Sequence, residues 1–552
     1  MRYSLALLML CAPAFTLADS GDAVRYAHLK DEITAAADLM KAKPAMEEAV
    51  KIYTQDGDLW WRLGRARLQA KEYDSGIEAY QNALKLGAFG NKFKASVEYD
   101  LACAYSLKGD REKGFELLGK SLDAGFRDLQ HLREDTDLTL LHGGKRWMEL
   151  AATKDVSKMS RDEGWRYDLW LLNREVSRIH YNAYSRYSKA EQEGWVRNLN
   201  AAIPKMTDHQ IQVAFMKYMR RVNDGHSHIR PNHTAMNPSL PIQLAWFQEG
   251  MMITAADPSL KELLGSRIVK LAGHPIEAIM SKLNEIVPQD NAQDLIARAP
   301  LYLRIPAMLH GLGFMADKNE IELGVLDGSG NARTVTVRAF TNPDPSKWTA
   351  CRDTSESASP LDLKHRDKPY WFELLPDRKA VYMQYNAVQN DPAEDTAHFA
   401  KRLFDTIDQS DVNALIVDVR WNGGGNSFLN LPIVNGIIAC KKIQTRGHLF
   451  VITGRDTFSA AQNFTTDVGR ACNPIYVGEP TGSSPNFVGE SVAFSLPYSK
   501  MEGSISDLYW QRSWPMDARI WIAPDLPAAP RFDLYKANRD PAMEAVEAYM
   551  RS

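Results

Sequence analysis

The chain has 552 residues, of which 45% are apolar and 24% are charged, and its formal net charge at pH 7 is −3. These values describe an ordinary globular protein that is long enough for two to four domains. The balanced charge gives no support for nucleic acid or an anionic membrane surface as a partner.

The first 18 residues predict a secretory signal peptide. Arg2 supplies an early positive charge, a short apolar run follows, and small residues precede a cleavage site after Ala18. The apolar run is too short to span a bilayer comfortably, and no later run resembles it, so we expect no membrane span. Leu10 stands where a lipoprotein signal needs a small residue, which argues against lipidation of Cys11. We therefore expect an exported protein, periplasmic or extracellular.

Export leaves four cysteines, too few in a chain of this size to form a disulfide framework. One bridge would be compatible with the sequence, and its partners are not determined by it. The four residues are Cys103, Cys351, Cys440 and Cys472.

Residues 19–157 are predicted to be helical and repetitive. The positions of Leu63, Gly76 and Leu84 recur 38 residues later as Leu101, Gly114 and Leu122. This spacing resembles the tetratricopeptide period with a short insertion around Gly87 to Lys92. Such arrays present a concave surface, so this region is a candidate site for a protein partner or a peptide.

One stripe of this region could be read as core or as a ligand site. At helical spacing, aromatic and apolar side chains more often form the core of a helix pair, and we interpret the stripe in that way. It consists of Trp60, Leu63, Tyr80 and Ala83.

Residues 158–235 form a second helical segment that ends in Asp224-Gly225-His226-Ser227-His228. An imidazole titrates near neutral pH, so His226 is a candidate general base. His226, His228 and His233 could instead bind a metal, or His226 could be a structural, hydrogen-bonded residue. No Cys or carboxylate completes a recognisable metal spacing here, and we predict no metal site.

Residues 236–345 alternate short apolar runs with turns and predict a small β-rich module with a helical insert around Leu295 to Leu312. Residues 346–368 are polar and read as a linker or an exposed loop. Residues 369–552 then show the pattern of a mixed α/β domain.

The central strand of that domain is predicted at Ala414 to Val419 and leads into Arg420 and three glycines, Gly423 to Gly425. Asp418 and Arg420 stand two apart and point to the same side. Open α/β sheets bind ligands at the carboxyl ends of their strands. A plain glycine-rich turn would also explain the pattern.

A second buried strand, Leu449 to Thr453, is followed by a turn and by a helix that opens at Ser459. A serine at this place has the positive end of a helix dipole behind it, which suits a nucleophile. Serine is equally a favoured helix N-cap, which requires no chemistry.

Together these stretches resemble the tail-specific (C-terminal processing) serine peptidases and the catalytic core of tricorn protease. The resemblance covers roughly residues 160 to 552 and implies a ClpP/crotonase-like sheet with a PDZ-like module. It rests on four elements in the family's order, which are Asp418-x-Arg420-x-Asn422-x-Gly424-Gly425, Ser459-Ala460-Ala461-Gln462, Val477-Gly478-Glu479-Pro480-Thr481-x and Asn538-Arg539-Asp540-Pro541.

The resemblance also implies roles for single residues. Some relatives use a Ser–Lys dyad, but the position of that lysine holds Ser484 here, which makes a histidine base necessary. We therefore expect Ser459 as nucleophile, His226 as general base, and the N–H groups of Gly424 and Ala460 as the oxyanion hole. Asp517 is the candidate third member, and a surface pair of Asp517 with Arg519 is an equally good reading.

The resulting hypothesis is an exported serine peptidase that needs no cofactor and acts on peptides or proteins. The alternative is a non-catalytic ligand- or peptide-binding protein on the same fold. A scaffold in which only the helical repeats function is a third reading, and the presence of Ser459, His226 and the glycines argues against it. The sequence does not determine the substrate or the oligomeric state.

Overall fold

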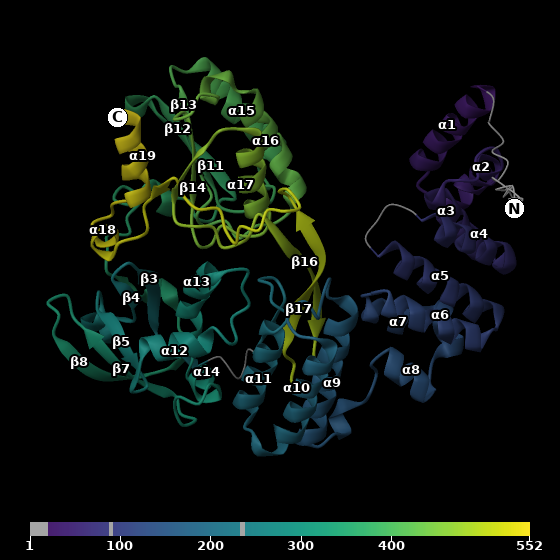
Figure 1. Ribbon diagram of the computed structural model, residues 1–552, viewed down its shortest axis with the longest axis horizontal. Coiled ribbons are helices and arrows are strands. Elements are labelled where there is room, and N and C mark those ends of the chain that lie inside the picture. The colour runs from purple at the N-terminus through teal and green to yellow at the C-terminus, as the bar shows by residue number, and fades with distance from the viewer. Residues whose placement is uncertain (1–19, 88–91, 232–237) are drawn as a thin grey trace, which may run out of the picture. The chain divides into compact units, whose positions relative to one another are not determined.

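The computed structural model describes residues 20–87, 92–231 and 238–552 (Figure 1). The predicted signal peptide, His233 and residues 88–91 of the expected insertion lie outside this range. The chain divides into two compact units, Met1–Asp155 and Val156–Ser552. The division falls close to the predicted domain boundary at 157/158.

The first unit consists of helices, and consecutive helices pack in pairs, α1 on α2, α3 on α4 and α5 on α6. A short 3₁₀ helix, Thr136–Leu141, packs on α5 and α6. The helices are α1 (Ser20–Ala35), α2 (Leu39–Ile52), α3 (Gly57–Gln69), α4 (Tyr73–Leu86), α5 (Phe93–Lys108), α6 (Arg111–Asp123), α7 (Leu129–Glu134) and α8 (Gly144–Leu150).

The stripe interpreted as core is largely buried within this unit. Leu63, Tyr80 and Ala83 are fully buried, and Trp60 packs at the edge of the same cluster. A Cβ at Gly64 would lie 2.6 Å from the Tyr80 ring, so the glycine permits the close approach of α3 and α4. The classification of these helices as tetratricopeptide-like stays a prediction.

The second unit begins with three helices, α9 (Arg161–Ile179), α10 (Lys189–Ala202) and α11 (Asp208–Arg220), all capped by Ser or Thr. After α11 the chain turns through His226 into the short strand β1 (His228–Arg230). The histidine motif therefore lies in the turn between the last helix and this strand.

Residues 238–350 form the β-rich module, built on a seven-stranded sheet in which the strand pairs are antiparallel. Three helices accompany it, α12 (Ile276–Leu283), α13 (Ala292–Tyr302) and α14 (Pro306–Gly311). The two-stranded pair β2 (Pro238–Ser239) and β9 (Phe340–Thr341) lies outside that sheet. The resemblance of this module to PDZ domains stays a prediction. The strands of the seven-stranded sheet are β3 (Ile242–Phe247), β4 (Gly250–Ala256), β5 (Arg267–Leu271), β6 (His274–Pro275), β7 (Glu320–Leu326), β8 (Ala332–Arg338) and β10 (Thr349–Ala350).

A six-stranded sheet in the order β11-β12-β13-β14-β15-β18 forms the α/β domain. Only β11 runs antiparallel to its neighbour. The strands are β11 (Tyr370–Leu375), β12 (Ala380–Tyr385), β13 (Ala414–Asp418), β14 (Leu449–Thr453), β15 (Ile475–Gly478) and β18 (Leu526–Pro527). The helices are α15 (Thr396–Gln409), α16 (Leu431–Ala439), α17 (Ala460–Ala471), α18 (Phe532–Lys536) and α19 (Pro541–Arg551).

Both faces of this sheet are covered, as the continuous apolar strands predict. One face packs against α15, α16 and α17 through residues such as Leu415 and Phe464. The other packs against α19 through residues such as Ile416 and Val546 (Figure 1). Successive residues of β13 thus enter opposite cores.

A long hairpin, β16 (Asn486–Ser495) and β17 (Glu502–Gln511), joins the helical segment to the α/β domain. Strand β1 pairs antiparallel with β17, with His228 opposite Ser504. At the hairpin turn, Asp168 of α9 accepts the N–H groups of Tyr498 and Ser499 at 3.1 and 2.7 Å. The hairpin therefore fixes strand β1, and with it the histidine turn, against strand β17.

Parts of the expected linker, residues 346–368, form specific contacts with neighbouring elements. Strand β10 pairs with β4, and Asp362, in a 3₁₀ turn, is buried and bonded to the α/β domain. Most of the other residues in this stretch are exposed or half-buried, and its reading as a linker or an exposed loop stays a prediction.

The four described cysteines all carry free thiols. Among the described residues, no helix combines the length and apolar character that a bilayer crossing requires.

The docking of the hairpin turn on α9 leads to a prediction with a matched control. A Cβ on Gly164 of α9 would lie 2.2 Å from the Tyr498 ring, whereas a Cβ on Gly194 of α10 meets only the end of Arg197 at 3.6 Å. We expect Gly164→Ala to destabilise the protein by about 1–3 kcal/mol through overpacking. Gly194→Ala should stabilise it by about 0.5–1 kcal/mol, because alanine is the better helix former. Urea unfolding measures both, and equal effects would show that the turn does not rest on α9.

Candidate active site

Ser459 occupies the turn between strand β14 and helix α17, where it is the N-cap residue. Its backbone has φ +53° and ψ −121°, a conformation that residues other than glycine rarely adopt. Such strain costs about 1–3 kcal/mol and persists only where the surroundings enforce it, which is typical of functional positions. Its side chain makes no cap bond to the helix, so the N-cap reading does not account for this serine.

The glycine loop lies directly against this turn. A Cβ on Gly424 would lie 2.6 Å from the Ser459 Cβ and 2.9 Å from the Ala460 nitrogen. Ala460 is the first residue of α17, where N–H groups have no acceptor within the helix. The Gly424 N–H donates to Asn422 Oδ1 at 2.9 Å. The predicted oxyanion donors are thus neighbours of the serine, and one of them is engaged by its own loop.

The imidazole of His226 lies between two aromatic rings. Phe458, the residue before Ser459, is stacked on it at 4.4 Å between ring centroids, and Phe487 of β16 at 5.3 Å. The fold therefore brings His226 against the neighbour of the predicted nucleophile. No hydrogen bond joins His226 to Ser459, and both buried ring nitrogens lack a partner of acceptable geometry among the described residues.

Burial lowers the pKa of His226 to about 4, and the nearby charge of Asp224 offsets only part of this effect. The ring is therefore neutral at neutral pH and has a lone pair available to accept a proton. A buried polar group without a partner costs about 1–3 kcal/mol, and an incoming donor would satisfy the ring nitrogen that carries the lone pair. The Val488 backbone lies close to the ring and favours its protonated form, which opposes burial in part.

The backbone of the histidine turn is fixed by Asp224. This carboxylate accepts the N–H of His226 at 2.8 Å and the Ser506 hydroxyl at 2.9 Å, and His180 Nε2 lies 2.9 Å from it. Burial alone would raise the pKa of Asp224, but these partners outweigh burial and the pKa is lowered. Asp224 therefore stays ionised and holds the turn.

Asp290 is a site residue that the sequence analysis missed. It accepts the N–H of Gly225 at 2.7 Å and the hydroxyl of Ser483 at 2.8 Å. Ser483 in turn accepts the N–H of Ser459 at 3.4 Å. Burial, followed by the charge of Asp294, raises the pKa of Asp290 well above its usual range. Asp290 and Ser483 together thus link the turn of His226 to the turn of Ser459.

Asp517, the predicted third catalytic residue, pairs with Arg519 at 2.7 Å and accepts the Ser513 hydroxyl at 2.5 Å. The hydrogen bond from Arg519 lowers its pKa. This is the surface pair that the sequence allowed as the alternative, and none of its bonds reaches His226. Ser484, at the place of the dyad lysine, donates to the Ile520 carbonyl at 3.1 Å.

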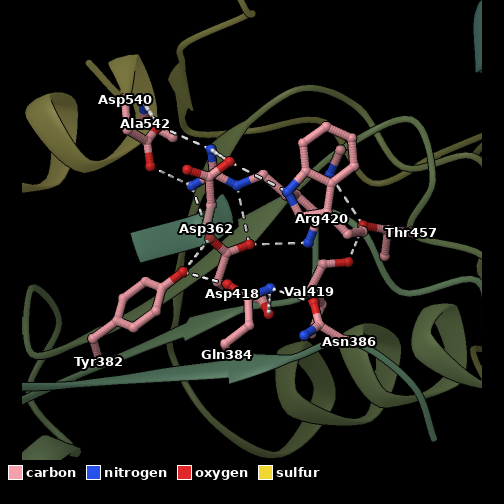
Figure 2. A network of polar contacts seen from close by, with 12 residues as sticks. Asp362, Tyr382, Gln384, Asn386, Asp418, Val419, Arg420, Thr457, Asp540 and Ala542 are labelled. Carbon is pink, nitrogen blue, oxygen red and sulfur yellow. Dashed lines mark hydrogen bonds and ion pairs between the residues drawn. The ribbon is translucent and has the colours of Figure 1, made fainter. Parts of the chain in front are cut away.

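A buried arginine holds the strand that leads into the glycine loop (Figure 2). Arg420 donates two parallel bonds to Asp540 at 2.8 and 2.7 Å and a third to Asp418 at 3.1 Å. Asp362 lies 3.5 Å from the same guanidinium and accepts from Trp421 at 3.2 Å. Three carboxylates therefore surround one cation.

Figure 2 also shows Tyr382 of β12, whose hydroxyl lies 2.8 Å from Asp418 and within hydrogen-bond distance of Gln384. Burial raises the pKa of Asp362, opposed by the charge of Arg420, so this carboxyl takes up a proton more readily than an exposed aspartate. A proton on Asp362 would reduce the excess negative charge of the cluster.

A cavity of about 410 Å³ lies beside the same loops. It is lined by the turn after β14, by Trp421 and by residues of the β-rich module such as Trp246. Arg366 stacks over Trp421 at 4.6 Å from the ring centroid and also faces the cavity. Aromatic walls with a few charged groups are typical of ligand pockets.

One group of described side chains has the spacing of metal ligands, namely His209, His310 and Asp317. None of them belongs to the predicted catalytic set. His228 lies 3.0 Å from the Ser504 hydroxyl through Nδ1. His233 lies outside the described residues, so the structure does not test the metal reading of the histidine motif.

No family model matches the chain, and no curated protein matches it. Among solved structures, the chain is similar to mature CPAF in complex with lactacystin, with 10% identity, a TM-score of 0.50, and coverage of 71% of this chain and 98% of that one. A CPAF mutant gives 11% identity, a TM-score of 0.50, and coverage of 71% and 97%. The photosystem II D1 C-terminal processing protease has 14% identity, coverage of 70% and 99%, and a TM-score of 0.34. At these identities the likeness to CPAF is one of fold.

The arginine cluster yields a stability prediction. Arg420→Leu leaves buried carboxylates without their cation and should destabilise the protein by about 3–5 kcal/mol. Arg519→Leu removes an exposed arginine that pairs with Asp517, and the expected loss is about 0–1 kcal/mol. Urea unfolding measures the free energy of unfolding of both variants. Equal losses in the two variants would contradict a structural role for Arg420.

The buried imidazole predicts a pH dependence. Between about pH 6.5 and pH 4 the unfolded chain binds a proton on His226 that the folded state does not, so stability falls as the pH falls through this window. We expect wild type to lose about 2 kcal/mol more than His226→Phe between about pH 7 and pH 5. Other groups titrate in both proteins, so the difference isolates His226. Parallel pH profiles in urea unfolding would contradict the low pKa.

Proposed function

We propose that this protein is an exported serine peptidase in which Ser459 is the nucleophile and His226 the general base. The observation that supports it most strongly is the strained backbone of Ser459, φ +53° and ψ −121°, at a strand-to-helix turn with the glycine loop against it. The same kind of turn exposes the nucleophile in α/β-hydrolases. The fold shared with CPAF agrees with the proposal, as does the family resemblance in the motifs.

The proposed reaction is acyl transfer. His226 accepts the hydroxyl proton as Ser459 Oγ attacks the peptide carbonyl, and it returns that proton to the leaving amine. The resulting ester is hydrolysed by water, which His226 activates in the same way. The N–H groups of Ala460 and Gly424 stabilise the oxyanion, and Gly424 gives up its bond to Asn422 for this.

The absence of a hydrogen bond between His226 and Ser459 is compatible with this reaction. In free enzymes such bonds are often long and tighten only when substrate binds. The imidazole lies on Phe458, the residue before Ser459, and we propose that the side chain of His226 changes its angles to reach the hydroxyl. The cavity beside Trp421 is the proposed binding place for part of the polypeptide substrate.

The alternative function is binding without catalysis, which the absence of a bond between His226 and Ser459 favours. A fluorophosphonate probe separates the two, since it reacts only with an activated serine. Labelling of wild type that is lost in both Ser459→Ala and His226→Ala supports the peptidase. A folded protein that the probe never labels supports the binding protein.

We expect Ser459→Ala to lower peptide hydrolysis by about 10⁴-fold or more, because it removes the nucleophile. Ser484→Ala is the control, since its hydroxyl is bonded to Ile520 and it should keep most of the activity. Mass spectrometry of the products from a peptide library measures both and identifies the cleaved bonds. Unchanged product formation by Ser459→Ala would refute the assignment.

A further inference from the structure

A second cavity, of about 270 Å³, lies at the carboxyl end of helix α11, next to the turn that holds His226. None of its lining residues belongs to the proposed catalytic set. Its walls come from α10, α11, the end of α12 and the segment before α10. The lining residues are Arg186, Tyr187, Trp195, Lys217, Arg220, Arg221, Asn284 and Glu285.

The cavity has a large excess of positive charge. Three arginines and Lys217 face it, and Glu285 is the one acidic residue that lines it. Glu285 is itself shared, because Lys217 and Lys282 both lie 2.8 Å from its oxygens. Its single negative charge is therefore shared by two lysines, and its ion pairs do not include the three arginines.

Two of the arginines converge on one neutral oxygen. Arg186 and Arg220 both donate to Oδ1 of Asn223, at 3.2 and 3.1 Å. Within the described part of the chain, neither has a carboxylate at ion-pair distance. Burial, together with the positive charge of Arg186, lowers the pKa of Arg220. The charges of Asp294 and Asp224 oppose this effect only in part, and Arg220 also donates to the Asn284 carbonyl at 3.3 Å. Two cations held together with no carboxylate in direct contact favour an anion between them.

The third arginine is fixed in place. The Arg221 guanidinium lies 3.7 Å from the centroid of Tyr187 and 5.7 Å from that of Trp195, and its Nε donates to Gln192 at 2.7 Å. A guanidinium that is already oriented loses little entropy when it binds, and its planar fork matches the oxygens of a phosphate. The cavity is therefore arranged before any ligand enters.

We propose that this cavity is a binding site for a small oxyanion of the phosphate class, held by Arg186, Arg220 and Arg221. A phosphate group offers several oxygens and a charge close to −2, which suits three converging guanidinium groups better than the single charge of a carboxylate. Asn223, which two of these arginines hold, directly precedes Asp224 and has φ +70°. An anion in this cavity thus contacts the groups that fix the start of the histidine turn.

Isothermal titration calorimetry with inorganic phosphate, in chloride buffer of constant ionic strength, tests the proposal on the full protein. Wild type should bind one phosphate per chain in a saturable manner. Arg186→Ala and Arg220→Lys should each weaken binding at least tenfold, because both lose the geometry of the fork. Arg197→Ala is the matched control, since it removes an exposed arginine of α10 outside the cavity and should leave binding unchanged.

Three results would overturn the site: no saturable phosphate binding by wild type, an equal loss in Arg197→Ala, or acetate binding as tight as phosphate. Circular dichroism and thermal melting in phosphate-free buffer show whether the variants fold. Arg186 is exposed, so its alanine variant decides the matter even if Arg220→Lys unfolds. Binding requires no hydrolysis, and the result therefore stands independently of the proposed peptidase activity.

Discussion

The buried guanidinium of Arg420 is the constraint on which the α/β domain depends. It binds carboxylates from three separate segments, at the end of β13, in the turn around residue 362 and at the start of α19. A carboxylate removed from water is costly unless a cation accompanies it, so each segment is stable only while the others are in place. Strand β13 continues directly into the glycine loop, and the contact of Gly424 with Ser459 therefore rests on this cluster.

The strain at Ser459 is balanced by the packing around it. Helix α17 buries Ala461 and Phe464 completely under the sheet, and Thr457 Oγ1 donates to the Val419 carbonyl at 2.9 Å from within the turn. These contacts fix both ends of the turn, which leaves Ser459 to adopt the unfavourable backbone angles. The packing of the core thus offsets the conformational strain at Ser459.

Much of this organisation could be predicted from sequence, because it follows from periodicity and local chemistry. The two buried strands, the turn at Ser459 and the glycine loop all depend on short stretches, and the structure places the last two in contact. Asp290 could not be found in this way. It lies in no motif, and its role comes from burial between Gly225 and Ser483, residues that are distant from it in the chain.

Two other differences have the same origin. Asp517 stands where the tricorn pattern has a glutamate, and Arg519, two residues away, is its partner in the structure. Asp362 lies in a polar stretch that reads as a linker. Its carboxylate can be buried because the folded chain places the Arg420 guanidinium beside it. In each case the sequence shows the charged group, whereas its partner is determined by tertiary structure.

The pairing of β1 with β17 has a consequence for the newly made chain. His228 meets Ser504 only after most of the protein has been synthesised, and long-range strand pairs of this kind form late in folding. Until the hairpin emerges from the ribosome, nothing supports the histidine turn from that side. The order of synthesis itself thus delays the point at which the histidine turn is held in place.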